Sequence, residues 1–209
     1  MGDPKFPHKT YSTPRHPWEK DRIDSERVIV EKYGLKNKRE LWKGQSFLDN
    51  FRSQARDLQA KLRNNDPNAQ KQYDALIARL NRYKLLGGNA TLDDVLSLDI
   101  EAILARRLQT IVYRRNLART LKQARQLITH GHVTMNGRRV TIPGIMVEAS
   151  LEDSIEYVEN SPFKDDLHPM RQVIMSNVLP NGEKEQKEEA PPERNRGRND
   201  RQGRRGRGR

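Results

Sequence analysis

The side chains best suited to chemistry in this sequence are cations, and they gather between residues 106 and 139. This segment has no Asp or Glu, and its nine cations are Arg106, Arg107, Arg114, Arg115, Arg119, Lys122, Arg125, Arg138 and Arg139. Solvated helix faces usually mix both signs, because opposite charges three or four residues apart stabilise a helix slightly. A face of one sign repels itself until an anionic partner supplies the missing charge, and arginine donates paired hydrogen bonds to phosphate. The segment therefore predicts a surface that binds nucleic acid.

Two other interpretations of this basic segment are open. The face could be basic without binding anything, or it could lie on an anionic membrane. A membrane-surface helix needs a strong apolar face opposite its charges, but here the apolar residues are needed to pack the helices on one another. The sequence also has no run of about 20 apolar residues and no apolar signal segment at its N-terminus. We therefore expect no membrane partner and a cytoplasmic location.

Catalytic and metal-binding patterns are weak in this chain. The pair His130-x-His132 has no third metal ligand in local register, and there is no cysteine. The pairs Asp93-Asp94 and Asp165-Asp166 are adjacent carboxylates, but general acid–base catalysis needs a pocket and shifted pKa values. No phosphate-cradling glycine loop is present. We expect no enzyme activity, no metal site and no cofactor.

Composition indicates that only part of the chain can form a packed core. The 209 residues carry a net charge of +12, and hydrophobic and charged residues each make up 33%. Changes of pattern divide the sequence into an extended N-terminal arm, a small helical domain, an RNA-binding module, a short extension and a disordered Arg/Gly-rich tail, with the expected bounds 1–20, 21–98, 99–160, 161–182 and 183–209. The predicted fold class is α+β.

Apolar periodicity predicts the helices of the 21–98 domain. Residues 47–62 carry one helical stripe, from Phe47 to Leu62. The sequence Asn-Asn-Asp-Pro at 64–67 ends that helix, and Asp66 is expected to cap the next one. Thr91 and Asp94 have the spacing of a capping pair for a further short helix.

The 99–160 module reads as helix, helix, β-hairpin and more strand. A first helix from Asp99 carries Leu104, Leu108 and Ile111, with its arginines expected on the outer side. Thr120 with Gln123 predicts the capped start of a second helix, whose free backbone N–H groups suit a phosphate. Asn136-Gly137 predicts a type I′ hairpin turn. Residues 145–147 and 155–158 read as two further short strands.

The motifs RRLQTIVYR, ARQLITHGHVTMNGRRV and the following PG resemble the RNA-binding module of the small-subunit ribosomal protein four family, and the HPWEK arm resembles its archaeal type. The resemblance implies a structural protein that binds small-subunit rRNA in the 5′ domain during assembly, helps to line the mRNA entry region and touches small-subunit protein five. The RNA-facing positions that it implies are Arg106, Arg107, Arg114, Arg119, Thr120, Lys122, Arg125, Gln126, His130, His132, Asn136 and Arg138.

The chain departs from many bacterial members of that family in two places. Leu121 stands where they carry an arginine, and the N-terminal cysteine cluster is missing. Two other functions are weighed against a ribosomal role. An RNA-modifying enzyme could use the same module, but the remaining chain leaves no room for a catalytic domain. A free regulator of translation is the other alternative, and the sequence alone does not separate it from a ribosomal protein.

Overall fold

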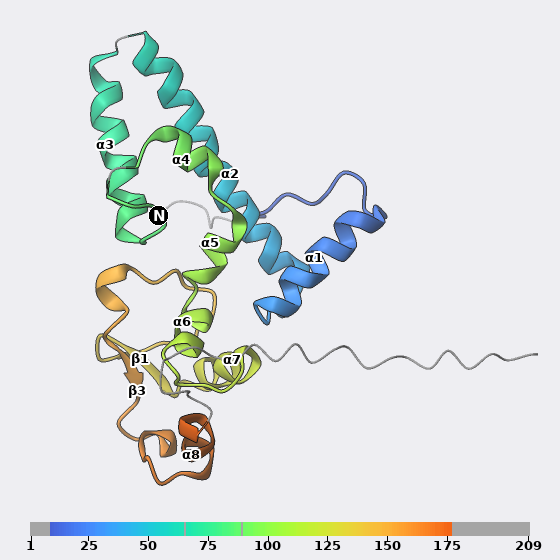
Figure 1. The fold of residues 1–209 in the computed structure, drawn as a ribbon, viewed down its shortest axis with the longest axis vertical. Coiled ribbons are helices and arrows are strands. Elements are labelled where there is room, and N and C mark those ends of the chain that lie inside the picture. Colours follow the sequence, from blue (N-terminus) through green and yellow to red (C-terminus); the bar gives the residue numbers. More distant parts are fainter. Residues whose placement is uncertain (1–8, 65, 89, 177–209) are drawn as a thin grey trace, which may run out of the picture.

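The computed structural model describes residues 9–64, 66–88 and 90–176, and it is mostly helical with one small sheet (Figure 1). In chain order the elements are α1 Lys20–Lys32, α2 Lys38–Arg63, α3 Pro67–Arg82, α4 Leu92–Ser97, α5 Ile100–Ala105, α6 Leu108–Arg114, α7 Leu121–Thr129, β1 Val133–Met135, β2 Arg138–Arg139, η1 Ala149–Leu151, β3 Ile155–Tyr157, η2 Pro162–Lys164 and α8 Pro169–Ser176. The long helices α2 and α3 lie toward one end, and the sheet lies toward the other end with α6 and α7 beside it. The α+β class is confirmed.

The helical part is organised around α2, which packs against α1, α3, α4 and α5. Most of the predicted stripe of α2 is buried, with Leu48 and Phe51 almost fully enclosed, whereas its end members Phe47 and Leu62 are partly buried. The Asn37 side chain caps α2 by accepting a hydrogen bond from the Glu40 backbone N–H at 3.2 Å. The capping box of Thr91 and Asp94 forms as predicted.

Asp66 does precede α3, with Pro67 in the first turn as predicted, but its side chain makes no capping hydrogen bond. Pro67 favours a helix start at this position, because its ring fixes φ near the helical value and its missing N–H is one that the first turn would leave unpaired.

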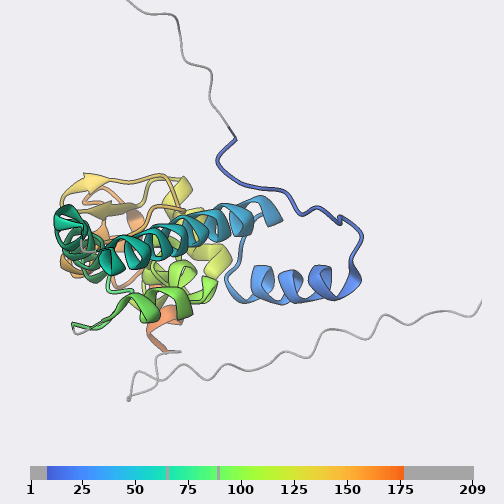
Figure 2. The same ribbon diagram turned by 90° about the horizontal axis from the view of Figure 1, so that it is seen from above.

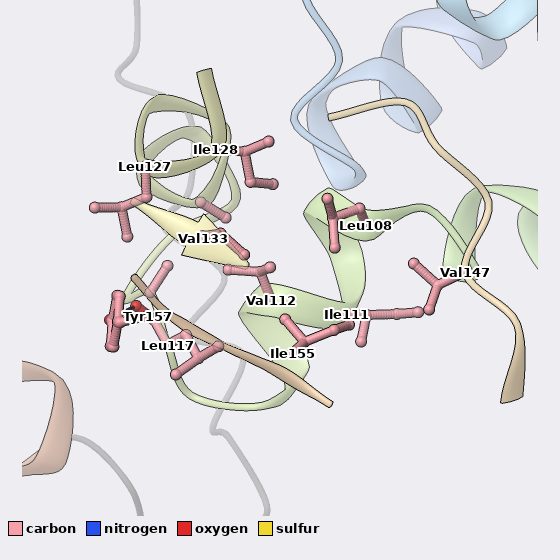
Figure 3. Close-up of a cluster of buried hydrophobic side chains, with 12 residues drawn as sticks. Leu108, Ile111, Val112, Leu117, Leu127, Ile128, Val133, Val147, Ile155 and Tyr157 are labelled. Carbon is pink, nitrogen blue, oxygen red and sulfur yellow. Dashed lines mark hydrogen bonds between the residues drawn. The ribbon is translucent and has the colours of Figure 1, made fainter. Parts of the chain in front are cut away.

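The module is built on a core between α6, α7 and the sheet. The sheet has the order β2-β1-β3 and is antiparallel, with Val133 opposite Tyr157 and Met135 opposite Arg138. Figure 3 shows apolar side chains from both helices and from β1 and β3 converging in this core. Leu108, Ile111 and Ile128 are fully buried there. The helix α6 is buried on more than one side, since Gln109 and Thr110 are buried as well.

The first predicted helix of the module is wrong in one respect, because it is interrupted between Ala105 and Leu108. The segment 143–147 takes the backbone hydrogen bonds that would have continued the helix. The Leu108 N–H donates to the Ile145 carbonyl at 2.8 Å, and the Val147 N–H donates to the Arg106 carbonyl at 3.0 Å. The predicted strand at 145–147 is also wrong. This segment pairs with the break at 106–108 through one isolated bridge, between Arg107 and Met146.

Three further outcomes concern the ends of the chain and the membrane. Residues 161–182, in which the apolar residues follow no clear period, contain η2 and α8, and the predicted disordered tail lies outside the described residues. The prolines of the described part of the arm keep 9–19 free of helix, as expected. None of the helices in the described ranges is long and apolar enough to cross a bilayer. The domain bounds stay predictions.

Candidate nucleic-acid interface

The twelve predicted RNA-facing residues fall into two groups in the structure. Eight are exposed to solvent, and they are Arg114, Arg119, Thr120, Lys122, Gln126, His130, Asn136 and Arg138. Two arginines are buried, Arg106 and Arg107, whereas Arg125 and His132 are half-buried. The expectation that all the arginines of the first helix point outward is therefore wrong.

Arg106 is held inside the module, with only 6% of the residue exposed. Its guanidinium donates to the Glu152 carboxylate at 2.8 Å and to the Val147 carbonyl at 3.1 Å. The hydrogen bond from Arg106 lowers the pKa of Glu152 despite the opposing effect of burial. Arg106 turns inward because the chain leaves the helix at Ala105, which directs this side chain toward the segment that carries Glu152.

Arg107 and Arg125 share one carboxylate from the helical part, that of Glu40 in α2. Arg107 Nη2 lies 2.9 Å from Glu40 Oε2, and Arg125 donates to both oxygens of the same carboxylate. Burial alone would raise the pKa of Glu40, but the hydrogen bonds and charges of the two arginines outweigh it and lower that pKa. This ion-pair network ties α2 to α7 across 85 positions of the sequence.

Gln109 completes the network and was not singled out from the sequence. It is 1% exposed, and its amide nitrogen donates to the Gly34 carbonyl at 3.0 Å and to the Leu121 carbonyl at 2.9 Å. Its amide oxygen accepts a hydrogen bond from Arg125 at 3.1 Å. The available signal was a polar residue next to an apolar stripe, but such a residue is more often exposed than buried.

The start of α7 carries the most compact group of exposed polar residues. The Thr120 hydroxyl caps the helix by accepting from the Gln123 N–H at 3.2 Å. The Gln123 side chain reaches back to the Arg119 N–H at 2.8 Å, one residue before the position expected in a capping box. Arg119 and Lys122 therefore flank a rigid helix start, and Gln126 lies one turn after Lys122.

The hairpin supplies the second group of exposed cations. Asn136 and Gly137 have φ values of 51° and 72°, so the predicted type I′ turn is confirmed. Arg138 is exposed beside this turn. Arg139 differs, because its guanidinium lies over Gly131 and donates to the His130 carbonyl at 3.0 Å. A cation at this position also complements the negative end of the α7 dipole.

The two histidines of the module have different surroundings. His130 is exposed, whereas His132 packs edge-on against Phe163 and its Nδ1 lies 3.1 Å from the Ser161 hydroxyl. Burial lowers the pKa of His132, and the charges of His130 and Arg139 lower it further. Among the residues that the structure describes, no group of three or more potential ligands could hold a metal ion.

Paired and unpaired cations thus separate within the segment 106–139. Arg106, Arg107, Arg115 and Arg125 form ion pairs with carboxylates from other parts of the chain. Within the described ranges no ion pair is formed by the other five, which are Arg114, Arg119, Lys122, Arg138 and Arg139. These five are exposed, and their arrangement suits the binding of phosphate groups.

Comparison with known proteins agrees with this geometry. A family model described as the S4 domain matches residues 106–153. The Small ribosomal subunit protein uS4 of Thermoplasma acidophilum is 66% identical over 84% of this chain and 88% of its own length. The proteins of the same name from Thermoplasma volcanium and Methanococcus maripaludis are 63% and 51% identical, over 92% and 84% of this chain and 96% and 98% of their own lengths. The chain therefore belongs to the uS4 family of small ribosomal subunit proteins, in its archaeal form.

Proposed function

We propose that this protein binds small-subunit rRNA through the unpaired cations of α7, the hairpin and the end of α6. As a member of the uS4 family, it is a structural constituent of the ribosome and not an enzyme. The observation that carries the proposal is the separation of cations. Carboxylates from elsewhere in the chain neutralise the inner arginines, which are Arg106, Arg107 and Arg125. The outer cations, which are Arg114, Arg119, Lys122, Arg138 and Arg139, have no such partner in the described part of the chain.

The mechanism follows from elementary electrostatics and from the rigidity of the helix start. Each cation that meets a phosphate releases counterions, which favours binding at low salt. Thr120 caps the first turn of α7, so the backbone N–H groups there keep one geometry and the flanking cations are attached to a defined backbone. Folded RNA is recognised mainly by its shape and backbone, because side chains do not reach the bases in its deep major groove. The proposed site therefore recognises the spatial arrangement of phosphate groups in the folded RNA.

Three finer proposals concern the partners. The RNA is the 5′ domain of the small-subunit rRNA, and in the ribosome the protein touches small-subunit protein five and helps to line the path of mRNA at its entry. Family membership and the resemblance of the module support these proposals. Its place in the ribosome also puts the protein in the cytoplasm.

A binding assay with two RNA transcripts tests the proposal. The full chain is titrated against the 5′ domain and the 3′ domain of the Thermoplasma acidophilum small-subunit rRNA, at several salt concentrations. We expect tighter binding to the 5′ domain and a strong loss of affinity with salt. Equal affinity for both transcripts would contradict the choice of RNA.

A sedimentation assay separates a ribosomal protein from a free regulator. We expect the chain to remain with small subunits after a high-salt wash. Release into the supernatant at that step would favour the regulator.

A further inference from the structure

Trp18, in the loop before α1, is the most exposed of the large apolar side chains in the described residues. It is 90% exposed, although tryptophan is highly buried on average. The other tryptophan, Trp42, behaves in the ordinary way. Its indole N–H donates to Glu26 at 3.1 Å, and its ring stacks on Tyr11 with the centroids 6.1 Å apart. Trp18 is thus a large aromatic surface that packs against little in the described part of the chain.

The loop that carries Trp18 is held in place by other residues. Arg22 Nη2 donates hydrogen bonds to the carbonyl oxygens of His16 and Pro17 at 3.0 and 3.1 Å. The same guanidinium is paired with Glu26 at 2.6 Å. Further along the arm, the Ser12 N–H donates to the Ser46 hydroxyl at 3.2 Å. The arm thus runs from the start of α1 back to α2, as the dark blue segment of Figure 2 shows, and Trp18 is displayed by a fixed backbone.

Charge around Trp18 favours an anionic partner. Residues 9–22 contain four Lys or Arg and two carboxylates. One of these carboxylates, Glu19, lies 3.7 Å from Arg22, whereas Arg15 and Lys20 are exposed on either side of the tryptophan. An exposed indole between cations has the chemistry of a stacking platform for single-stranded nucleic acid, because every base offers a flat face and the cations meet the backbone.

We propose that Trp18 stacks on an unpaired base of the small-subunit rRNA 5′ domain, as a second contact separate from the module. This inference rests on the proposed function. The fixed loop makes the contact favourable, because little conformational freedom remains to be lost on binding. A pocket on another ribosomal protein could also accept an indole. Such a partner would protect Trp18 only in assembled small subunits and not in the complex with the transcript.

Affinity measurements on variants test the contact. In binding to the 5′ domain transcript, Trp18→Ala should weaken affinity by about 5- to 150-fold, the range expected for loss of one base–aromatic stack. Trp18→Phe should retain most of the affinity, since a phenyl ring also stacks. Neither change removes a charge, so the slope of affinity against salt should stay the same. Val28→Ala is the matched control, because Val28 is an exposed apolar residue of α1 at 64%, and it should bind like the wild type.

Fluorescence gives an independent readout, because the chain has only two tryptophans. The transcript should quench wild-type emission and protect it from acrylamide, and Trp18→Phe should remove most of this effect. If Trp18→Ala bound the transcript as tightly as the wild type, and the transcript did not protect wild-type emission from acrylamide, the stacking contact would be refuted. The proposed function would stand. Protection only in assembled small subunits would indicate a protein occupant and would also refute the stacking contact. A wild-type chain that does not bind the transcript would overturn the proposed function as well.

Discussion

The sharpest test of the interface removes two unpaired cations from the start of α7. In the double variant Arg119→Ala/Lys122→Ala, two exposed side chains are lost that form no ion pair within the described part of the protein. The cap of Thr120 and the core face of α7 remain. We therefore expect the folded structure and its free energy of unfolding to change little, and RNA binding to change in a way set by charge.

The size of the effect follows from counterion release. Each lost phosphate contact reduces the slope of log affinity against log salt by about 0.7–0.9, so the double variant should be less salt-dependent by about 1.4–1.8. Between 50 and 200 mM salt, the ratio of wild-type to variant affinity should consequently fall by about tenfold. A loss of affinity that is the same at every salt concentration would not fit this reasoning.

Filter binding to the 5′ domain transcript at four or more salt concentrations measures both quantities. The matched control is Lys61→Ala/Arg63→Ala, which removes the same charge from exposed positions at the C-terminal end of α2. That end lies away from the module in Figure 1. If the control lowers the slope as much as the α7 variant, binding depends on net charge alone and the assigned surface is wrong.

The remaining predictions concern stability and are measured by chemical denaturation. Replacing Glu40 by Ala leaves the guanidinium groups of Arg107 and Arg125 without their shared carboxylate. We expect this change to lower the free energy of unfolding by about 3 kcal/mol, the low end for a broken buried ion pair. Because the folded pKa of Glu40 is lowered, its stabilisation is complete above the ordinary carboxyl pKa and is lost as pH falls below about 4.5. Glu40→Gln should therefore be less sensitive to acid than the wild type, and equal sensitivity would contradict the network. Thr120→Ala should cost about 1 kcal/mol through the lost cap, whereas Thr120→Ser should cost much less. Gly131→Ala should cost about 1–2 kcal/mol, because Gly131 has φ +76° and an added Cβ would displace Arg139; an unchanged unfolding curve would show that the turn adapts freely.

Short-range chemistry explains which features could be predicted from the sequence. The Asn136-Gly137 turn and the cap of Thr120 each depend on residues within three positions of one another, and both are confirmed. Helix periodicity identified the buried stripe of α2 for the same reason. Such signals are local, so they can be recognised without knowledge of the tertiary structure.

The orientation of the arginines could not be predicted, because their partners are distant in the chain. Arg106 pairs with a carboxylate 46 positions away, and Arg107 with one 67 positions away. Counting carboxylates between 106 and 139 says nothing about those that other segments bring to the same place. The break after Ala105 has a similar origin, since the hydrogen bonds that interrupt the helix come from the loop at 143–147.

The absence of carboxylates from the segment therefore serves two purposes. The inner arginines need acceptors from other segments. Their pairing with Glu40 joins α2 to the module, and the pairing of Arg106 with Glu152 holds the loop after the hairpin within the module. A carboxylate of the segment's own would compete for them. The outer cations have no carboxylate partner in the described part of the chain, and they lie on α6, at the start of α7 and on the hairpin, which share one packed core. Because the backbone that carries these cations is held in place before RNA arrives, mainly side-chain freedom is lost on binding, and more of the electrostatic attraction remains as affinity.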